Sequence, residues 1–598
     1  MTLNRTPLLL ALSALALLTA CDDGGNGSQS SWLDWLKGKD EPKQQAILLN
    51  MPTDYVRETQ AGNYLAGQFA QYRGDWKTAN KYLDKVIQID TANVELQQRA
   101  MVLAMQAGDT NRALVLARKV LEEDDKNLLA LLFVGVDQMA RQEYSDATRS
   151  VSRMPQNGIA DFVRPILIAW ARTPDKKIDD EMLVASGPLH AYHALLIADY
   201  LGKVNDPEKY FVNVLTGGAA DPHILEMMAD VYARQDSKEL ADKIYDTLIT
   251  QAAESNMTDR VERLKAKREN PELGKASRIE TPAQGAAEAF YNMARMLFND
   301  QSDESALVFA RLSQHLNPTK ADTKMLMARM MVRTDHPEEA IEFYKSIPAG
   351  SAEYDEAQRS AAELLEKEGK IDQSIVYLEN AYAQTKDIDA LVQIGDVYRR
   401  AERHLEAIKA YDRAVSVLGG KVSSDYWHLL YARGMSYERS GNLKKAEDDL
   451  EAALEFRPDH PYLLNYLGYS WADQGKKLDK SLELIEKAAN LKPDDGYIID
   501  SLGWVYYKMA NYEDAVVQLE KAVELVPYDP TINDHLGDAY WQVGRKNEAR
   551  FQWARAMNAS KDDKEKAALE LKISDGLDVK KTPVMEAKTA HPEEPVKR

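Results

Sequence analysis

Apolar residues in the second half of the chain recur with helical periodicity, in pairs of amphipathic segments about a dozen residues long. One glycine marks the first segment of each pair, and successive glycines lie 39, 34, 35 and 34 residues apart: Gly395, Gly434, Gly468, Gly503 and Gly537. An Ala or Ser follows each glycine after twelve or thirteen residues, and an Ala follows seven residues later. This period predicts helical hairpins stacked in a linear array, with small residues where two helices approach closely.

Weaker copies of the pattern extend toward the N-terminus and begin near residue 60, with Gly67, Gly74, Trp76 and Ala79 in the first unit. The stretch between residues 253 and 286 is highly charged and contains Pro271 and Pro282, which is typical of a break between segments. The sequence therefore predicts an N-terminal array over 60–252 that degenerates toward its end, a charged irregular hinge over 253–286, middle repeats over 287–387, a regular array over 388–563, and a capping helix with a disordered tail over 564–598.

The repeat resembles the tetratricopeptide repeat (TPR), a helix-turn-helix unit of 34 residues. One unit carries most of its signature residues: Gly434, Tyr437, Gly441, Ala446, Ala453 and Pro458. The resemblance implies an all-α superhelical solenoid of about 12–14 helix-turn-helix repeats. It also implies a scaffold that binds proteins or peptides rather than an enzyme.

The first twenty residues predict a signal peptide, because Arg5 precedes a short apolar run that ends just before Cys21. The run is too short to span a bilayer comfortably. Its end resembles a bacterial lipobox, which implies lipidation of Cys21 and stable anchoring by two or more acyl chains. An ordinary secretory signal with an incidental Cys is the alternative. Asp22 resembles an inner-membrane retention signal, whereas the family resemblance favours the outer membrane.

Residues 21–59 predict a lipid-anchored tether and an N-terminal cap. The first ten residues after Cys21 are mostly small and polar, as in a flexible linker. The amphipathic turn that follows, with Trp32 and Trp35, suits two roles: it could enter the lipid headgroup layer, or dock on the first repeat as a cap.

Composition excludes several functions. The chain has 598 residues and a net charge of −20, so no basic nucleic-acid footprint exists at the level of the whole chain. The single cysteine rules out an internal disulfide and a Cys-based metal site. His190 and His193 share a helical turn but lack a third ligand at suitable spacing. We expect no metal, no cofactor and no catalytic residue, although an active site hidden in 253–286 is an alternative.

The informative chemistry is a surface. In TPR proteins the first helix of each repeat lines the concave face, and mapping its positions onto this chain gives a candidate partner-binding groove: Tyr462, Asn465, Tyr469, Asp500, Trp504, Tyr507, Asp534, Asp538 and Trp541. Large rings beside Asn and Asp suit a peptide ligand. The alternative is that these rings pack against neighbouring repeats or the C-terminal segment. No Lys occupies the fifth helix positions, which argues against a clamp for a terminal carboxylate.

The combination of lipobox, tether and repeats resembles proteobacterial repeat lipoproteins. Among these are the adaptors of envelope carboxyl-terminal-processing proteases, which deliver cell-wall hydrolases for degradation. By that resemblance the protein is a periplasm-facing, membrane-anchored adaptor whose partners are a periplasmic protease, a wall hydrolase or an envelope complex. The alternative function is an assembly factor for outer-membrane proteins, polysaccharide export or pili.

Overall fold

The computed structural model describes residues 59–577 except 92, 156–157, 177–179, 216–220 and 256. The described residues form thirty α-helices, α3 to α32, and three short 3₁₀ helices, joined by turns and loops, and they contain no strand. The predicted all-α repeat array is thus confirmed. The predictions for the signal peptide, Cys21, the tether and the tail after residue 577 fall outside the described residues.

The chain forms two compact units, an N-terminal unit, Met1–Ala357, and a C-terminal unit, Gln358–Arg598. The boundary falls inside α20 (Tyr354–Lys367). The segment predicted as a hinge, 253–286, lies within the N-terminal unit and contains α15 (Thr258–Glu269) and the 3₁₀ helix η3 (Pro271–Ser277). Its Lys267 pairs with Glu226 and Asp230 of α13, at 2.8 and 2.9 Å, so this segment is attached to its own repeat.

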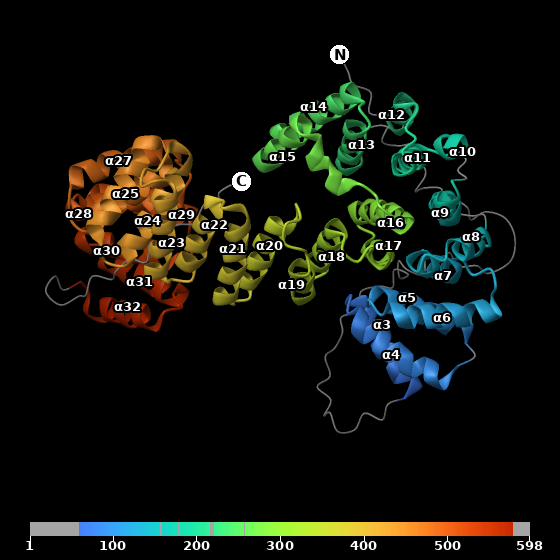
Figure 1. The fold of residues 1–598 in the computed structure, drawn as a ribbon. Helices are drawn as coiled ribbons and strands as arrows, with labels where there is room; N and C mark the ends of the chain where they lie inside the picture. Colours follow the sequence, from blue (N-terminus) through green and yellow to red (C-terminus); the bar gives the residue numbers. More distant parts are fainter. Residues whose placement is uncertain are drawn as a thin grey trace, which may run out of the picture. The chain divides into compact units, whose positions relative to one another are not determined.

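The helices of each unit follow one another as antiparallel pairs (Figure 1). In the N-terminal unit they are α3 (Gln60–Tyr72), α4 (Trp76–Ile89), α5 (Val94–Gln106), α6 (Thr110–Glu123), α7 (Leu128–Ala140), α8 (Tyr144–Ser152), α9 (Ile159–Ala171), η2 (Thr173–Asp175), α10 (Asp180–Ala185), α11 (Pro188–Tyr200), α12 (Pro207–Leu215), α13 (Pro222–Arg234), α14 (Lys238–Glu254), α15, η3, α16 (Pro282–Asn299), α17 (Asp303–Leu316), α18 (Ala321–Arg333) and α19 (Pro337–Lys345). In the C-terminal unit they are α21 (Ile371–Thr385), α22 (Ile388–Arg400), α23 (His404–Val417), η4 (Ser424–Tyr426), α24 (Trp427–Arg439), α25 (Leu443–Phe456), α26 (Pro461–Asp473), α27 (Leu478–Leu491), α28 (Gly496–Lys508), α29 (Tyr512–Leu525), α30 (Pro530–Gln542), α31 (Lys546–Ala559) and α32 (Asp563–Asp575).

Local sequence explains where these helices begin. Asp and Asn residues precede many of them and accept hydrogen bonds from backbone N–H groups of the first turn, as Asp495 does from Tyr497 and Ile498. Asp529 does the same for α30, whose first residue is Pro530. These caps satisfy donors that have no partner within the helix. Gly441 and Gly544 have positive φ angles of 82° and 84° and allow the sharp turn between the two helices of a repeat.

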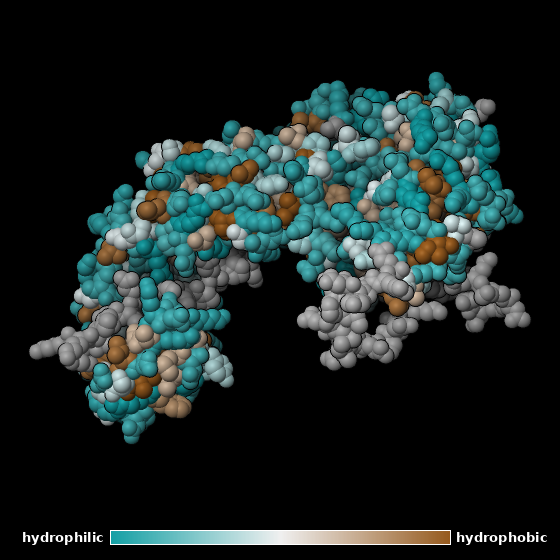
Figure 2. All heavy atoms as spheres, turned by 90° about the horizontal axis from the view of Figure 1, so that it is seen from below, coloured by the Kyte–Doolittle hydropathy of each residue, from teal (hydrophilic) through white to brown (hydrophobic). Residues whose placement is uncertain are grey.

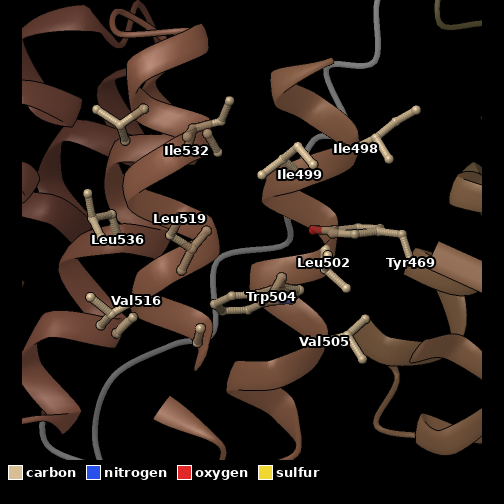
Figure 3. Packing of buried hydrophobic residues seen from close by; sticks show 14 of the residues in the cluster. Tyr469, Ile498, Ile499, Leu502, Trp504, Val505, Val516, Leu519, Ile532 and Leu536 are labelled. Atoms are coloured by element: carbon tan, nitrogen blue, oxygen red, sulfur yellow. The ribbon is translucent and has the colours of Figure 1, made fainter. Parts of the chain in front are cut away.

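The repeated glycines are the points where the two helices of a repeat touch. A Cβ on Gly503 of α28 would lie 2.5 Å from Cγ of Leu519 on α29, and one on Gly537 would lie 2.5 Å from Cδ1 of Trp553. Real Cβ atoms essentially never come so close to a neighbour. Figure 3 shows the apolar cluster around α28, in which Leu519 and Trp504 are both buried. The missing side chain lets the second helix seat its bulky residue against the first.

The N-terminal unit folds back on itself. Helices α16 and α17 pack against α5, α7, α9 and α11, which are far away in the sequence. The Gln106 side chain donates to the backbone carbonyl of Glu304 at 3.2 Å, and Arg311 donates to the carbonyl of Gln106 at 3.4 Å. The inner helices of the first repeats are therefore covered by a later part of the same chain.

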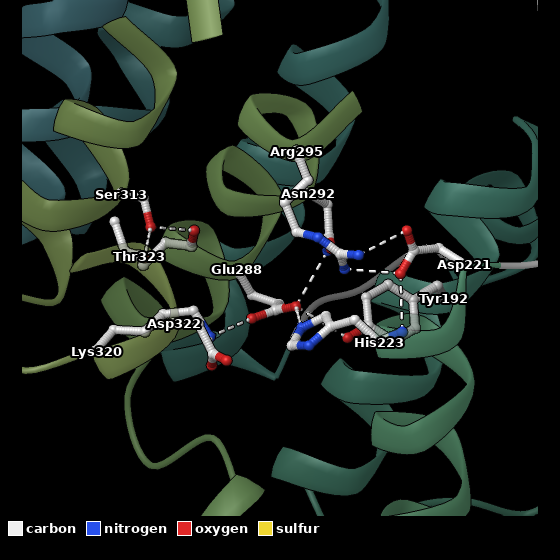
Figure 4. A network of polar contacts seen from close by, with 11 residues as sticks. Tyr192, Asp221, His223, Glu288, Asn292, Arg295, Ser313, Lys320, Asp322 and Thr323 are labelled. Atoms are coloured by element: carbon white, nitrogen blue, oxygen red, sulfur yellow. Dashed lines mark hydrogen bonds and ion pairs between the residues drawn. The ribbon is translucent and has the colours of Figure 1, made fainter. Parts of the chain in front are cut away.

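A buried polar network holds this arrangement together (Figure 4). Glu288 of α16 is 2% exposed, and its carboxylate contacts His223 at 2.8 Å, Lys320 at 2.9 Å and the Tyr192 hydroxyl at 3.1 Å. Burial alone would raise the pKa of Glu288, but Lys320 and His223 hold it well below its ordinary value. One charged residue thus joins four helices or loops that are spread over the sequence from Tyr192 to Lys320.

The glycine contact gives a stability prediction. Replacing Gly503 with Ala forces the new Cβ against Leu519. The higher helix propensity of Ala offsets up to about 1 kcal/mol of this cost. We expect a net fall of about 1–2 kcal/mol in the free energy of unfolding. Urea unfolding of the full chain, followed by circular dichroism, measures the change. The exposed Lys521→Ala variant on α29 is the control and should unfold like the wild type. A midpoint for Gly503→Ala at or above that of the wild type would contradict the close-approach account.

Candidate binding face of the C-terminal unit

The nine predicted groove residues lie on three consecutive first helices, α26, α28 and α30. Neighbouring first helices contact each other directly, as α26 and α28 do, and α28 and α30. In the N-terminal unit the corresponding inner helices are covered by α16 and α17. The candidate site therefore lies in the C-terminal unit.

Trp504 is at the centre of a stack of rings between α28 and α30. Its ring lies 3.9 Å from that of His535, nearly parallel, and 4.8 Å from that of Tyr507. Trp504 is only 6% exposed, and its indole N–H has no hydrogen-bond partner among the described residues. Nδ1 of His535 lies 3.0 Å from both carboxylate oxygens of Asp500. Burial would lower the pKa of His535, but Asp500 raises it above its ordinary value.

Three predicted groove residues are held by α32, the last helix that the structure describes, and by the residue that follows it. Nζ of Lys572, on α32, lies 2.7 Å from Asp534 and 2.8 Å from Asp538, and all three side chains are almost fully buried. The backbone of Gly576 lies against the ring of Trp541, where a Cβ would come within 2.0 Å of Cζ2. At the α30 end of the predicted groove, the residues therefore pack against the C-terminal segment. This is the alternative that the sequence left open.

The remaining predicted residues form a different environment on α26. Asn465 is 1% exposed and its side-chain oxygen has no partner in the described part of the chain. Tyr469 is 5% exposed, and burial raises the pKa of its hydroxyl well above the ordinary value. Tyr462 is half-buried near the start of α26, and its ring lies 6.0 Å from that of His460.

Sequence mapping missed an aromatic group at the same end of the neighbouring helix. Trp427, the first residue of α24, lies 4.6 Å from the ring of His460 and stacks at 6.4 Å on Tyr431. The Tyr431 ring in turn meets the edge of Tyr466 at 5.8 Å. Trp427 and His460 escaped notice because they occupy the first helix position and the capping position, which the family pattern does not assign to the groove. Together with Tyr462 and half-buried Tyr497 they form what we call the aromatic face: Trp427, Tyr431, His460, Tyr462 and Tyr497.

Electrostatics limit what this face could bind. Asp534 and Asp538 are already paired with Lys572, and burial together with Asp534 raises the pKa of Asp538 to about 6. These two carboxylates are therefore not available to a cationic ligand while α32 stays in place. We infer that half-buried rings, rather than a field of free carboxylates, give the face its chemistry.

No group of three or more His, Cys, Asp or Glu residues in the described ranges is arranged to hold a metal ion. Likewise, none of the helices that the structure describes is long and apolar enough to cross a membrane. Hydrophobic residues are scattered in small groups over a mostly hydrophilic surface in Figure 2.

Sequence profiles identify the repeat. Residues 386–459 and 431–496 match profiles described as tetratricopeptide repeat, and residues 503–544 match one described as TPR repeat. The fold is a tetratricopeptide-repeat array. TPR arrays are typically scaffolds for protein–protein interaction without catalytic activity of their own.

Two curated proteins are similar to parts of the chain. A TPR repeat-containing protein of Pseudomonas aeruginosa is 29% identical over 176 residues, which is 29% of this chain and 29% of that protein. Tetratricopeptide repeat protein 14 of Mus musculus is 34% identical over 89 residues, 15% of this chain and 11% of the mouse protein. The chain thus spans less than a third of the length of these relatives.

Several solved structures of repeat proteins are similar to the chain at low identity and low TM-score. A tetratricopeptide repeat protein from Parabacteroides merdae is 15% identical with a TM-score of 0.35, covering 42% of this chain and 98% of that one. YrrB, described as a TPR protein with an unusual peptide-binding site, is 22% identical with a TM-score of 0.25, covering 32% and 92%. The Cut9–Hcn1 tetramer is 14% identical with a TM-score of 0.33, covering 87% and 97%. The fold assignment itself rests on the profiles and on this chain's own helices.

The Lys572 cluster gives a pH-dependent prediction. Replacing Lys572 with Met leaves two buried carboxylates without their cation, so we expect the C-terminal unit to lose about 3 kcal/mol of stability at pH 8. The loss should be smaller at pH 5. In the wild type Lys572 lowers the pKa of Asp538, which burial and Asp534 still raise to about 6, so removal of Lys572 raises that pKa further. Such a carboxyl contributes stability below its unfolded pKa of about 4 and loses that contribution as the pH rises through its folded pKa.

Urea unfolding at the two pH values measures this difference, and the exposed Lys564→Met variant on the same helix is the control. An equal loss for Lys572→Met at pH 5 and pH 8 would show that the cluster does not act through charge.

Proposed function

We propose that the protein is a scaffold whose C-terminal unit binds an extended segment of a partner protein along its first helices, over the aromatic face. The observation that carries this proposal is the run of half-buried rings from Trp427 to Tyr497 on three successive first helices. Such rings bury a large area at low cost in side-chain entropy and keep a polar edge for hydrogen bonds.

The buried polar atoms near the rings support a peptide ligand. The Asn465 oxygen and the Trp504 indole N–H are both buried, and both lack partners among the described residues. A peptide backbone offers an N–H donor and a C=O acceptor at every residue, so it can supply both kinds of partner. In addition, uncompensated buried polar atoms cost free energy that a ligand would recover.

We further propose that the protein works at the bacterial cell envelope, anchored through lipidated Cys21 and facing the periplasm. The support is the apolar run of residues 8–18 that ends just before that cysteine. Anchoring one end of the array raises the effective concentration of bound proteins near the membrane without any new contact. In this setting the scaffold delivers substrates, such as wall hydrolases, to a periplasmic protease.

The groove prediction concerns capture of the partner. Replacing both Tyr462 and Tyr497 with Ala removes two half-buried rings at the margin of the apolar cluster, so we expect capture to fall about tenfold or more while the helical content stays unchanged. Crosslinking pull-down from native membranes, quantified by mass spectrometry, measures the fall. Val517→Ala, an exposed residue of the second helix α29, is the control. Undiminished capture by the double variant would place binding elsewhere on the protein.

The proteins recovered also separate the two biological roles. A protease recovered with a wall hydrolase supports the adaptor, whereas components of an outer-membrane, polysaccharide-export or pilus machine support the assembly factor.

The anchor prediction concerns Cys21. Replacing Cys21 with Ala removes the only thiol in the chain, so we expect the protein to leave the membrane fraction and to lose incorporation of a labelled fatty acid. Fractionation and metabolic labelling of cells that express each form measure both effects. Ser13→Ala, within the same apolar run, is the control. Continued labelling of the Cys21→Ala protein would exclude a lipid on this residue.

A further inference from the structure

The described chain ends at the α30 end of the row of first helices. Trp541, which it meets there, is in the last turn of α30, whereas Trp427, Tyr462 and Tyr497 are in the first turns of α24, α26 and α28. After α32 the chain continues to Gly576, whose backbone lies against Trp541, and to Leu577, which packs against the same apolar cluster as Trp504. Trp541 is one of the residues that the TPR pattern assigns to the concave face. Residues 578–598 therefore follow in the sequence from a point at one end of the row of first helices.

Residues 578–598 are long enough to follow that row. Twenty-one residues in an extended polyproline-type conformation, at about 3.1 Å each, reach about 65 Å. Neighbouring packed helices lie about 10 Å apart, so the four steps from α30 to α22 cover about 40 Å. The segment can therefore pass Tyr507, Tyr462 and Trp427 without any change in the folded helices.

The composition of the segment suits the aromatic face. Pro583, Pro592 and Pro595 favour an extended backbone, and prolines dock well into aromatic-lined grooves. The segment contains no Phe, Tyr or Trp. It carries five Lys or Arg residues against four Asp or Glu residues, in a chain with a net charge of −20. The acidic remainder of the chain therefore repels this near-neutral, proline-containing piece little.

We propose that residues 578–598 bind in cis along the aromatic face of the C-terminal unit and compete there with the partner segment. This inference rests on the proposed function, because it requires the face to bind extended peptides. In the protein without a partner, this segment occupies the aromatic face, and a partner binds by displacing it. A partner therefore binds the aromatic face only if it binds more tightly than the tethered segment or is present at a high local concentration.

Tethering makes even weak binding effective. A short flexible connection gives an effective concentration in the millimolar range. If the free segment binds with a Kd of about 100 μM, its tethered form fills about nine-tenths of the sites and weakens a competitor about tenfold. We therefore expect removal of residues 578–598 to tighten peptide binding about tenfold, with no change in the helices up to Leu577.

The cis contact is tested in the full chain. A photoreactive benzoylphenylalanine replaces Tyr462 in one protein and the exposed Val517 of α29 in another. After irradiation, mass spectrometry maps the crosslinks in the monomer fraction. We expect crosslinks from position 462 to peptides within 578–598, at a yield independent of protein concentration. A yield no higher than that from position 517 would overturn the proposal.

Competition is tested with a labelled synthetic peptide of residues 578–598 and two proteins, the full chain and a form ending at Leu577. We expect the shortened form to bind the peptide about tenfold more tightly, and Tyr462→Ala with Tyr497→Ala to abolish that binding. A scrambled peptide is the control. Equal binding to both forms, or binding to neither, overturns the proposal. If binding to neither is found while the double variant still loses native partners in the pull-down, the proposed function stands and the cis occupant alone is wrong.

Discussion

The contact at the repeated glycine is the constraint on which the rest of the structure depends. Where the first helix lacks a side chain, a residue of the second helix closes onto its backbone: Tyr411 on Gly395, Ile485 on Gly468 and Leu519 on Gly503. This contact fixes the distance and angle within each hairpin. Because each hairpin buries only one face alone, the next hairpin must cover the other, and the array continues until a helix such as α32 ends it.

Both units are built from the same hairpins, but the faces formed by their first helices differ. In the N-terminal unit, α16 and α17 cover the inner helices, and the Glu288 network secures them through His223, Lys320 and Tyr192. Breaking such a network would leave a buried charge without partners, so the covering helices are strongly held. In the C-terminal unit, the row from α24 to α28 has half-buried rings instead, and Lys572 and Gly576 close the end at α30.

Sequence alone predicted the repeats well because their signature is local. The close approach requires glycine and alanine at fixed offsets, and these offsets are visible without any knowledge of the fold. The interval of 39 residues between Gly395 and Gly434 likewise corresponds to an extended connection that contains η4 (Ser424–Tyr426).

Contacts between distant segments could not be predicted in this way. Nothing near Lys572 in the sequence indicates that it pairs with Asp534 and Asp538, which precede it by 38 and 34 residues. The fold-back of α16 and α17 depends on side chains such as Gln106 and Arg311, whose types are common on any helix surface. Trp427 and His460 joined the aromatic face only once the register between α24 and α26 was known. Periodicity identifies the hairpins, whereas the partners of a charged or aromatic residue depend on how the hairpins stack.

The central claim is that partners bind the first helices of the C-terminal unit. Hydroxyl-radical footprinting, read by mass spectrometry on the protein alone and with its captured partner, tests it most directly, because oxidation reports the exposure of individual rings. The account predicts lower oxidation of Trp427, Tyr462 and Tyr497 in the complex, while Tyr528, which is 84% exposed in the turn before α30, keeps its rate. Protection of Tyr528 or of rings in the N-terminal unit, with those three unchanged, would contradict it.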